Sequence, residues 1–364
     1  MNSSSVLEPL ERLNPARFEV PSITRRLISA HRRLAELKGV ATSMPNQGIL
    51  ISTLGLQEAK DSSEIENIVT THDELFREAA ALDGIGSPAA KEVAQYSRAL
   101  AVGFNMVRGT GLLTGNFIVD IQAVLEPKRP GYRRVPGTTL KDNSGRIVYT
   151  PPTPDLIPEL MSSLEHFIND GERFNADPLV KMALIHHQFE SIHPFYDGNG
   201  RTGRIINVLY LVKEGLLDIP VLYLSRAIVR SKQDYYALLQ EVRDNDRWEE
   251  WVGYMLWAVE ETAAETINTI RQIKDLLMDY KHRIRLAYKF YSQDLINNIF
   301  SHPYTKIEFV ENDLEVSRIT ATKYLETLTE DGFLQKRKVG RTNYYINEPL
   351  FRILTGEPPP VADV

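Results

Sequence analysis

Twelve residues at positions 193–204, His-Pro-Phe-Tyr-Asp-Gly-Asn-Gly-Arg-Thr-Gly-Arg, constrain the fold of this chain more than any other stretch. The run before them, from Ala176 to Ile192, opens with Asp-Pro and repeats apolar residues every three or four positions, which predicts a capped helix. The apolar run after them stops at Glu214-Gly215, a typical helix end. The stretch is therefore predicted to be a tight loop that leads into the N-terminus of a second helix.

The residue types in this loop suit phosphate chemistry. Glycines permit positive φ and close backbone approach, and the free N–H groups of a helix N-terminus bind anions. Arg201 and Arg204 lie one helical turn apart, so their forked donors can hold phosphate oxygens. Asp197 offers a hard oxygen to Mg²⁺, and His193 is placed to accept a proton from a hydroxyl. The residues alone predict a site for attack on a nucleotide phosphate.

The same residues resemble the HxFx(D/E)GNGRxxR motif of the Fic (filamentation induced by cyclic AMP) family. The resemblance implies a Fic helical-bundle fold and transfer of AMP from ATP, with Mg²⁺, to a Ser, Thr or Tyr hydroxyl of a target protein, and of the chain itself. It implies His193 as the catalytic base and Asp197 at the metal. It also assigns nucleotide contacts to seven consecutive residues: Gly198, Asn199, Gly200, Arg201, Thr202, Gly203 and Arg204.

A second signature lies upstream. Residues 62–67, Ser-Ser-Glu-Ile-Glu-Asn, fit the (S/T)xxxE(G/N) pattern of the inhibitory helix in the same family. The resemblance implies that Glu66 pairs with Arg204 and keeps that arginine from the γ-phosphate, since one guanidinium cannot fully satisfy a carboxylate and a phosphate. From the residues alone, Glu66 is also compatible with an exposed position on an amphipathic helix.

Short strands are predicted at 130–135 and 147–150, joined through a turn at 142–145. The pattern alone indicates a surface hairpin. The resemblance makes it the flap that docks the target segment as an added strand, with Val148 and Tyr149 near the target or adenine.

Tyrosines and histidines outside the loop allow more than one interpretation. Tyr236, the second residue of a tyrosine pair, resembles a tyrosine that lies against adenine in related sequences, although core packing is the alternative. Where some relatives have asparagine, seven residues later, this chain has Arg243. His186 and His187 have no carboxylate spacing typical of a zinc site and are expected to be ordinary helix residues.

Composition excludes several classes of protein. The 364 residues include no cysteine, so disulfides, thiolate catalysis and cysteine-based metal sites are excluded, and a reducing cytoplasm is expected. The net charge of −6 does not favour non-specific nucleic-acid binding. No stretch is apolar enough to predict a membrane span.

The predicted fold class is mainly α, with the small flap hairpin and a C-terminal winged helix-turn-helix module. The expected domains are an N-terminal helical region at 1–85 with the inhibitory helix, a catalytic domain at 86–290 and the winged-helix module at 291–364. Gly39 is predicted to end the first long helix. An apolar stripe within 248–291 indicates core or a subunit contact, which permits a homodimer.

The function of the C-terminal module stays open at this stage. Its hairpin is basic, but residues 301–364 contain more Asp and Glu than Lys and Arg, so protein contact is as good an interpretation as DNA binding. Three alternatives to AMP transfer remain. The site could transfer another group such as UMP, or remove AMP from a modified protein. The chain could instead be a DNA-binding regulator with a nucleotide-sensing domain.

Overall fold

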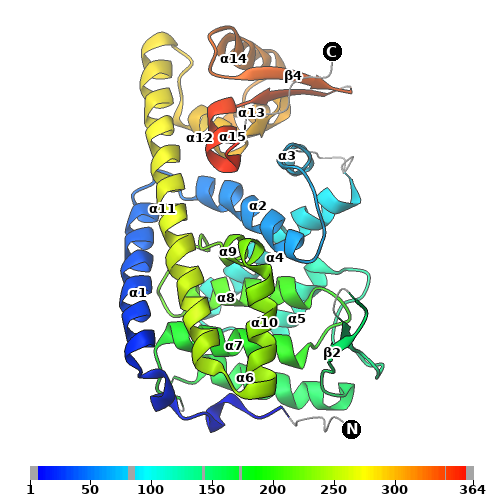
Figure 1. Cartoon of the computed structure of the whole chain (residues 1–364). Helices are drawn as coiled ribbons and strands as arrows, with labels where there is room; N and C mark the ends of the chain where they lie inside the picture. The colour runs from blue at the N-terminus through cyan, green and yellow to red at the C-terminus, as the bar shows by residue number, and fades with distance from the viewer. Residues whose placement is uncertain (1–6, 81–86, 142–143, 172–173, 341, 358–364) are drawn as a thin grey trace. The chain divides into compact units, whose positions relative to one another are not determined.

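The structure, a computed structural model, describes residues 7–80, 87–141, 144–171, 174–340 and 342–357. These residues form helices with two small antiparallel sheets, so the prediction of a mainly α fold is confirmed (Figure 1). The chain divides into two compact units, each treated separately below. One comprises Met1–Lys38, Asp61–Asn67 and Gln95–Ala264, and the other comprises Gly39–Lys60, Ile68–Ala94 and Glu265–Val364.

Four helices have residues in both units: α1 (Pro21–Thr42), α2 (Gly48–Ile65), α4 (Pro88–Thr110) and α11 (Trp248–Ala287). The remaining elements of the first unit are η1 (Leu10–Arg12), η2 (Pro15–Phe18), α5 (Gly115–Leu125), β1 (Leu140–Lys141), β2 (Ile147–Tyr149), η3 (Pro154–Leu156), α6 (Ile157–Asn169), α7 (Pro178–Ile192), α8 (Asn199–Lys213), α9 (Leu224–Arg230) and α10 (Lys232–Asn245).

Helices α7 and α8 form the centre of the first unit, and α5 and α6 pack against them. Asp177 caps α7 by accepting a hydrogen bond from the N–H of Leu179 at 2.9 Å, as its position before Pro178 predicts. Every residue of α7 from Leu179 to Ile192 is buried. The loop that follows α7 therefore starts from a helix held on all sides.

The strand predicted at 130–135 is wrong. Tyr132 makes one isolated bridge to Phe195, and the N–H of Arg133 donates to the carbonyl of Pro194 at 2.9 Å. The backbone of this segment therefore pairs with the loop after α7 and not with a partner strand. The hairpin consists instead of β1 and β2, which pair antiparallel with Leu140 opposite Tyr149. The second predicted strand, at 147–150, is confirmed, and part of the predicted turn, residues 142–143, lies outside the described residues.

The second unit contains α3 (His72–Ala80), α12 (Gln293–Ser301), β3 (Tyr304–Thr305), α13 (Ile307–Leu314), α14 (Arg318–Glu330), β4 (Gln335–Val339), β5 (Thr342–Ile346) and α15 (Glu348–Thr355). Its sheet has the strand order β3-β5-β4. Helices α13 and α14 with the β4–β5 hairpin supply the helix pair and hairpin that the sequence predicts. The winged-helix assignment and its role stay predictions.

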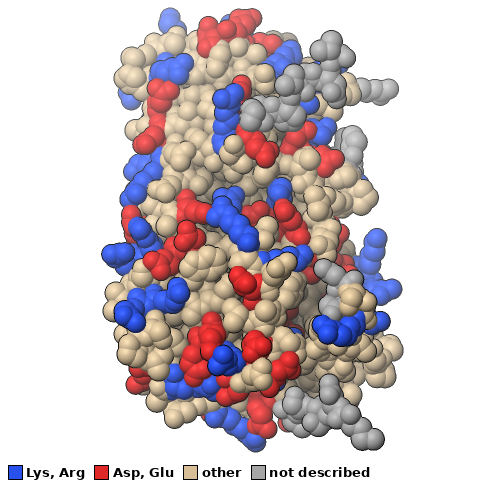
Figure 2. Space-filling view, viewed as in Figure 1, with Lys and Arg blue, Asp and Glu red and all other residues tan. Residues whose placement is uncertain are grey.

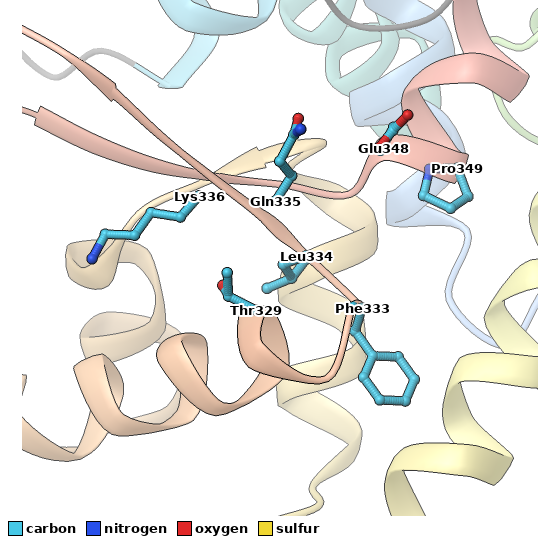
Figure 3. Close-up of a pocket in the computed structure, with 8 residues that line it drawn as sticks. Thr329, Phe333, Leu334, Gln335, Lys336, Glu348 and Pro349 are labelled. Atoms are coloured by element: carbon cyan, nitrogen blue, oxygen red, sulfur yellow. The ribbon is translucent and has the colours of Figure 1, made fainter. Parts of the chain in front are cut away.

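Basic residues of the β4–β5 hairpin pair with acidic groups of the same unit. Lys336 bonds Glu326 on α14, and Arg337 pairs with Asp73 at 3.2 Å. A cavity of about 470 Å³ lies beside the start of β4, with Phe333, Lys336 and Glu348 in its lining (Figure 3). Positive and negative side chains are also intermixed on the face of the chain in Figure 2. The pairings of Lys336 with Glu326 and of Arg337 with Asp73 lower the positive potential that DNA binding through the hairpin would need.

Two helices test predictions about helix length. Gly39 does not end the first helix, because α1 continues to Thr42, and a Cβ at Gly39 would meet no atom within 4 Å. The apolar stripe of α11 is buried, as predicted for a core: Trp251, Met255, Val259 and Ala263 are 0% exposed. Among the described residues, none of the helices combines the length and the apolarity that a bilayer span requires.

Candidate active site

The loop between α7 and α8 turns through two left-handed residues. His193 follows the last residue of α7 with φ 48°, and Gly198 precedes α8 with φ 78°. Glycine adopts this conformation freely, whereas a histidine there is strained. The loop thus brings His193 next to the N-terminus of α8, whose first N–H groups can bind an anion.

The side chain of Asn199 stabilises the shape of the loop. Its Oδ1 accepts from the N–H of Phe195 at 2.9 Å, and its Nδ2 donates to the carbonyl of Phe195 at 3.0 Å. Both polar atoms of the amide are therefore used inside the protein. The nucleotide contact expected of Asn199 would come from its backbone N–H.

Arg204 is buried and paired with residues at the end of α2. Its Nη2 donates to Glu66 Oε1 at 2.9 Å and to the carbonyl of Ser62 at 2.9 Å, and its Nε donates to Ser62 Oγ at 2.8 Å. The serine and the glutamate of the upstream signature thus bind the same guanidinium. The expected pairing of Glu66 with Arg204 is present, although Glu66 lies just after α2, which ends at Ile65.

The Glu66 carboxylate also lies directly against the loop. A Cβ built on Gly200 would be 2.1 Å from Glu66 Oε1 and 2.9 Å from Arg204 Nη1. Gly200 is in the first turn of α8, so the carboxylate occupies space next to the N–H groups that suit an anion.

The charge states of this pair are mutually stabilised. Burial acts to raise the pKa of the Glu66 carboxyl, but the charge and hydrogen bond of Arg204 outweigh it, and the pKa is lowered. Burial acts to lower the pKa of Arg204, but Glu66 outweighs it and raises that pKa. Both groups are therefore charged at neutral pH.

Arg201 has a different set of partners. Its Nη2 donates to Glu126 Oε1 at 2.7 Å, and Asp197 Oδ1 lies 3.4 Å away. Glu126 is the residue directly after α5, and a Cβ on Gly198 would lie 3.2 Å from its Cγ. Each arginine of the loop is thus held by a glutamate from a distant part of the sequence.

A cavity of about 870 Å³ lies at the loop between α7 and α8. His193, Gly200, Arg204, Glu66 and Tyr236 all line it, together with Glu190, Arg243 and residues of β1 and β2. The other members of the predicted nucleotide set are not among its lining residues: Gly198, Asn199, Arg201, Thr202 and Gly203. The cavity is large enough for a nucleotide.

Aromatic and cationic groups gather where β2 meets α10. The guanidinium of Arg243 lies 4.0 Å from the ring centroid of Tyr149, and its Nε donates to Ser191 Oγ at 3.1 Å. Tyr236, which is half exposed, lines the same cavity, as does Val148. Flat groups around an open cavity suit a nucleobase, which stacks on rings and guanidinium planes.

His193 is set up to be a neutral base. Burial lowers the pKa of its imidazole to about 4, with Arg133 and Arg243 adding to the shift and Glu66 opposing it. At pH 7 the imidazole is therefore unprotonated and can accept a proton.

Glu190, one turn before His193 on α7, has no assigned role in the sequence analysis. Burial raises the pKa of its carboxyl to about 7, Glu66 adds to the rise and Arg204 opposes it. Its Oε1 would lie 2.6 Å from a Cβ at Gly203. Its position three residues before His193 in a predicted helix places Glu190 near the site, but no pattern in the sequence distinguishes such a residue from an ordinary helix glutamate.

The histidines before the loop are ordinary helix residues, as predicted, and both are buried. His186 Nε2 lies 2.8 Å from the hydroxyl of Tyr235, and His187 Nε2 lies 3.2 Å from the carbonyl of Leu239. The His186 ring stacks on Trp251, and the His187 ring meets Trp248 edge to face, both in α11 within the first unit. Among the described residues, no group of three or more potential metal ligands of the His, Cys, Asp and Glu types comes together.

Asp197, the residue expected at the metal, is not among the residues that line the cavity of about 870 Å³. Its side chain is 67% exposed at the N-terminus of α8, and Oδ1 accepts from the N–H of Gly198 at 2.7 Å. Mg²⁺ bound to nucleotides commonly takes one or two carboxylates, with phosphates and waters as its other ligands. The exposed carboxylate of Asp197 at the N-terminus of α8 is compatible with this kind of coordination.

Family models match most of the chain. Residues 24–105 match the N-terminal domain of the Fic/DOC family and residues 112–211 match the Fic/DOC family, so these two matches cover half of the chain. Residues 276–350 match the C-terminal domain of the protein adenylyltransferase SoFic-like type.

Curated relatives match over shorter spans. A probable protein adenylyltransferase of Aquifex aeolicus is 30% identical over 196 residues, which are 52% of this chain and 55% of the relative. The protein adenylyltransferase fic-1 of Caenorhabditis elegans is 32% identical over 129 residues, 33% of this chain and 23% of the relative. The chain thus spans about half of the first relative and about a quarter of the second.

A solved structure supports the fold. The crystal structure of a Fic family protein from Desulfovibrio desulfuricans superposes with a TM-score of 0.59, at 20% identity, over 90% of this chain and 96% of that one. Because the loop, the upstream glutamate and the family matches agree, we conclude that the chain belongs to the Fic/DOC family.

Proposed function

We propose that this chain is a protein adenylyltransferase, which transfers AMP from ATP to a Ser, Thr or Tyr hydroxyl of a target protein and of itself. One observation carries the proposal. A neutral histidine, the N-terminus of α8 and a buried arginine all face one cavity of nucleotide size. Relatives named as adenylyltransferases support the same activity.

The chain's own residues account for each step of the transfer. The triphosphate lies against the first turn of α8, where N–H groups and Arg204 bind its oxygens. His193 takes the proton of the target hydroxyl, whose oxygen attacks the α-phosphorus. The bond from the α-phosphorus to the bridging oxygen breaks, and pyrophosphate leaves. The helix N-terminus stabilises the charge that develops on the phosphoryl oxygens.

Mg²⁺ belongs to this proposal as the ion that neutralises phosphate charge, and Asp197 is the residue that would hold it. The adenine ring of ATP is proposed to lie by Tyr236, Val148 and the Arg243–Tyr149 pair. The β1–β2 hairpin is proposed as the flap that receives the target segment as an added strand.

We further propose that the chain is restrained by its own Glu66. The carboxylate holds Arg204 and lies against Gly200, so a triphosphate in this position would have to displace it. Both negative groups compete for one guanidinium and one helix N-terminus.

Label incorporation from ATP that carries the label on its α-phosphate tests the activity. Wild type, Glu66→Gly and His193→Ala are compared with magnesium, each alone and with cell lysate. Label on protein with wild type and with Glu66→Gly, and no label with His193→Ala, supports AMP transfer. Folded, ATP-binding protein that gives no label in any lane refutes it, and parallel reactions with labelled UTP identify a different donor.

A further inference from the structure

The conformation of His193 needs a cause. A non-glycine residue in the left-handed region is strained and persists only where the surroundings impose it. His193 has φ 48° at the C-terminal end of α7, where helices commonly use glycine. The last carbonyls of a helix also lack partners within the helix and need donors from elsewhere.

Arg133 supplies these donors. Its Nε donates to the carbonyl of His193 at 2.8 Å, and its Nη2 lies 3.4 Å from the carbonyl of Ile192. The backbone N–H of the same residue donates to the carbonyl of Pro194 at 2.9 Å. One residue therefore holds three consecutive carbonyls around the histidine.

The arginine also fixes the end of the hairpin. Its Nη2 donates to the carbonyl of Pro152, three residues after β2, and the hydroxyl of Tyr149 in β2 donates to the carbonyl of Ser191 at 2.9 Å. Its side chain is buried, with the residue 2% exposed, and does not line the nucleotide cavity. Arg133 can thus affect chemistry through the groups that it holds and through its charge, without contacting the nucleotide.

We propose that Arg133 is a positioning residue for His193, because its guanidinium holds the carbonyls that fix the histidine in its left-handed conformation. The inference rests on the proposed function for the role of His193 as base. It goes beyond that function in assigning the orientation of the base to a residue 60 positions upstream.

Geometry and charge act together in this arrangement. The planar fork of arginine reaches carbonyls that a lysine ammonium cannot reach at the same time. Its positive charge also disfavours the imidazolium, so it acts on the histidine in the same direction as burial and Arg243, and against Glu66. Removal of the guanidinium is therefore expected to loosen the histidine and raise the pKa of its imidazole.

Three variants separate these effects. Arg133→Met removes the donors and the charge, Arg133→Lys retains the charge without the fork, and Arg134→Met is the matched control at the exposed neighbouring position. Transfer kinetics are measured in wild-type and Glu66→Gly backgrounds. The pKa of the His193 imidazole is measured by NMR, with His193→Ala to identify its signal.

For Arg133→Met we expect kcat to fall on the order of 100-fold with KM for ATP changed less than about twofold, since a misplaced base affects chemistry more than binding. The pKa of His193 is expected to rise toward its ordinary value, and the acid limb of kcat/KM to move to higher pH. Arg133→Lys is expected to lower kcat while leaving that pKa low.

Two results would overturn the inference. In one, Arg133→Met and Arg134→Met have the same kcat, acid limb and imidazole pKa. In the other, Arg133→Met neither binds ATP nor shows a cooperative thermal unfolding transition, which indicates that Arg133 is needed for folding in general. If neither wild type nor Glu66→Gly transfers label, the proposed function fails, and the imidazole pKa measured by NMR still decides whether Arg133 acts on His193.

Discussion

Replacement of Glu66 by glycine is the most informative perturbation of this site. The carboxylate bonds Arg204 at 2.9 Å, and a hydrogen bond between charged groups contributes about 1.5–3 kcal/mol. The Glu66 side chain is 34% exposed, so the lower half of this range applies. If ATP must first break this contact, its removal should raise the rate at limiting ATP by about 10- to 50-fold, at 1.4 kcal/mol per factor of ten.

The assay is label incorporation from ATP labelled at the α-phosphate, measured as initial rates across ATP concentrations. Glu66→Gln is the matched variant, because it keeps the shape of the side chain and removes the charge. The initial rate of Glu66→Gln at limiting ATP should lie between the rates of wild type and Glu66→Gly. An unchanged or lower rate in Glu66→Gly, with ATP binding intact, would refute the competition between carboxylate and phosphate.

The pH dependence of the restraint provides an independent check. The pKa of Glu66 is lowered below its ordinary value, so its contact with Arg204 is present at neutral pH and is lost only as the solution is acidified through that lowered pKa. The ratio of the Glu66→Gly rate to the wild-type rate should therefore stay constant from about pH 6 to pH 9. A ratio that falls steeply within this range would show that another group controls Arg204.

Three further predictions concern single residues. His193→Ala should lower transfer by about 10²–10⁴-fold, the usual contribution of a general base, while ATP binding and thermal unfolding stay unchanged; retained transfer would remove His193 as the base. Asp197→Asn should raise the half-saturating magnesium concentration by about tenfold, for the loss of about 1.4 kcal/mol at one ligand, and an unchanged magnesium titration would contradict the metal role. Burial raises the pKa of Glu190 to about 7, so its folded form resists ionisation and the chain should lose stability as pH rises from about 4.5 to about 7. Glu190→Gln should remove that loss and raise stability at pH 8 by on the order of 3 kcal/mol relative to wild type, measured by thermal unfolding at pH 5 and pH 8; equal differences at both pH values would refute it.

Local signals in the sequence were sufficient for the helices that carry the site. Asp177-Pro178 defines the start of α7, and the glycines at 198 and 200 mark the turn and the first residues of α8, because caps and positive φ depend on residues close in sequence. The pairing of Glu66 with Arg204 was expected only through a resemblance, since no physical rule joins residues so far apart along the chain.

The partners of the loop residues could not be found in this way. No pattern in the sequence links Glu126 or Arg133 to the loop, and each meets the loop through tertiary packing. The segment around Arg133 was predicted as a strand because Tyr132 and Val135 favour β structure and Pro130-Gly131 precede them, but its backbone pairs with the loop after α7 instead. Local propensity therefore indicated an extended segment and gave no information about its partner.

Gly200 limits how this site can change. Any side chain at this position would meet Glu66 Oε1 and Arg204 Nη1 at less than van der Waals distance. The same missing Cβ admits the carboxylate of the resting protein and, in the proposed reaction, the phosphate of the substrate. If Glu66 restrains the protein as proposed, a side chain at Gly200 would displace the Glu66 carboxylate but would also exclude the phosphate. Mutations that activate the protein are therefore expected at Ser62 or Glu66 and not in the loop.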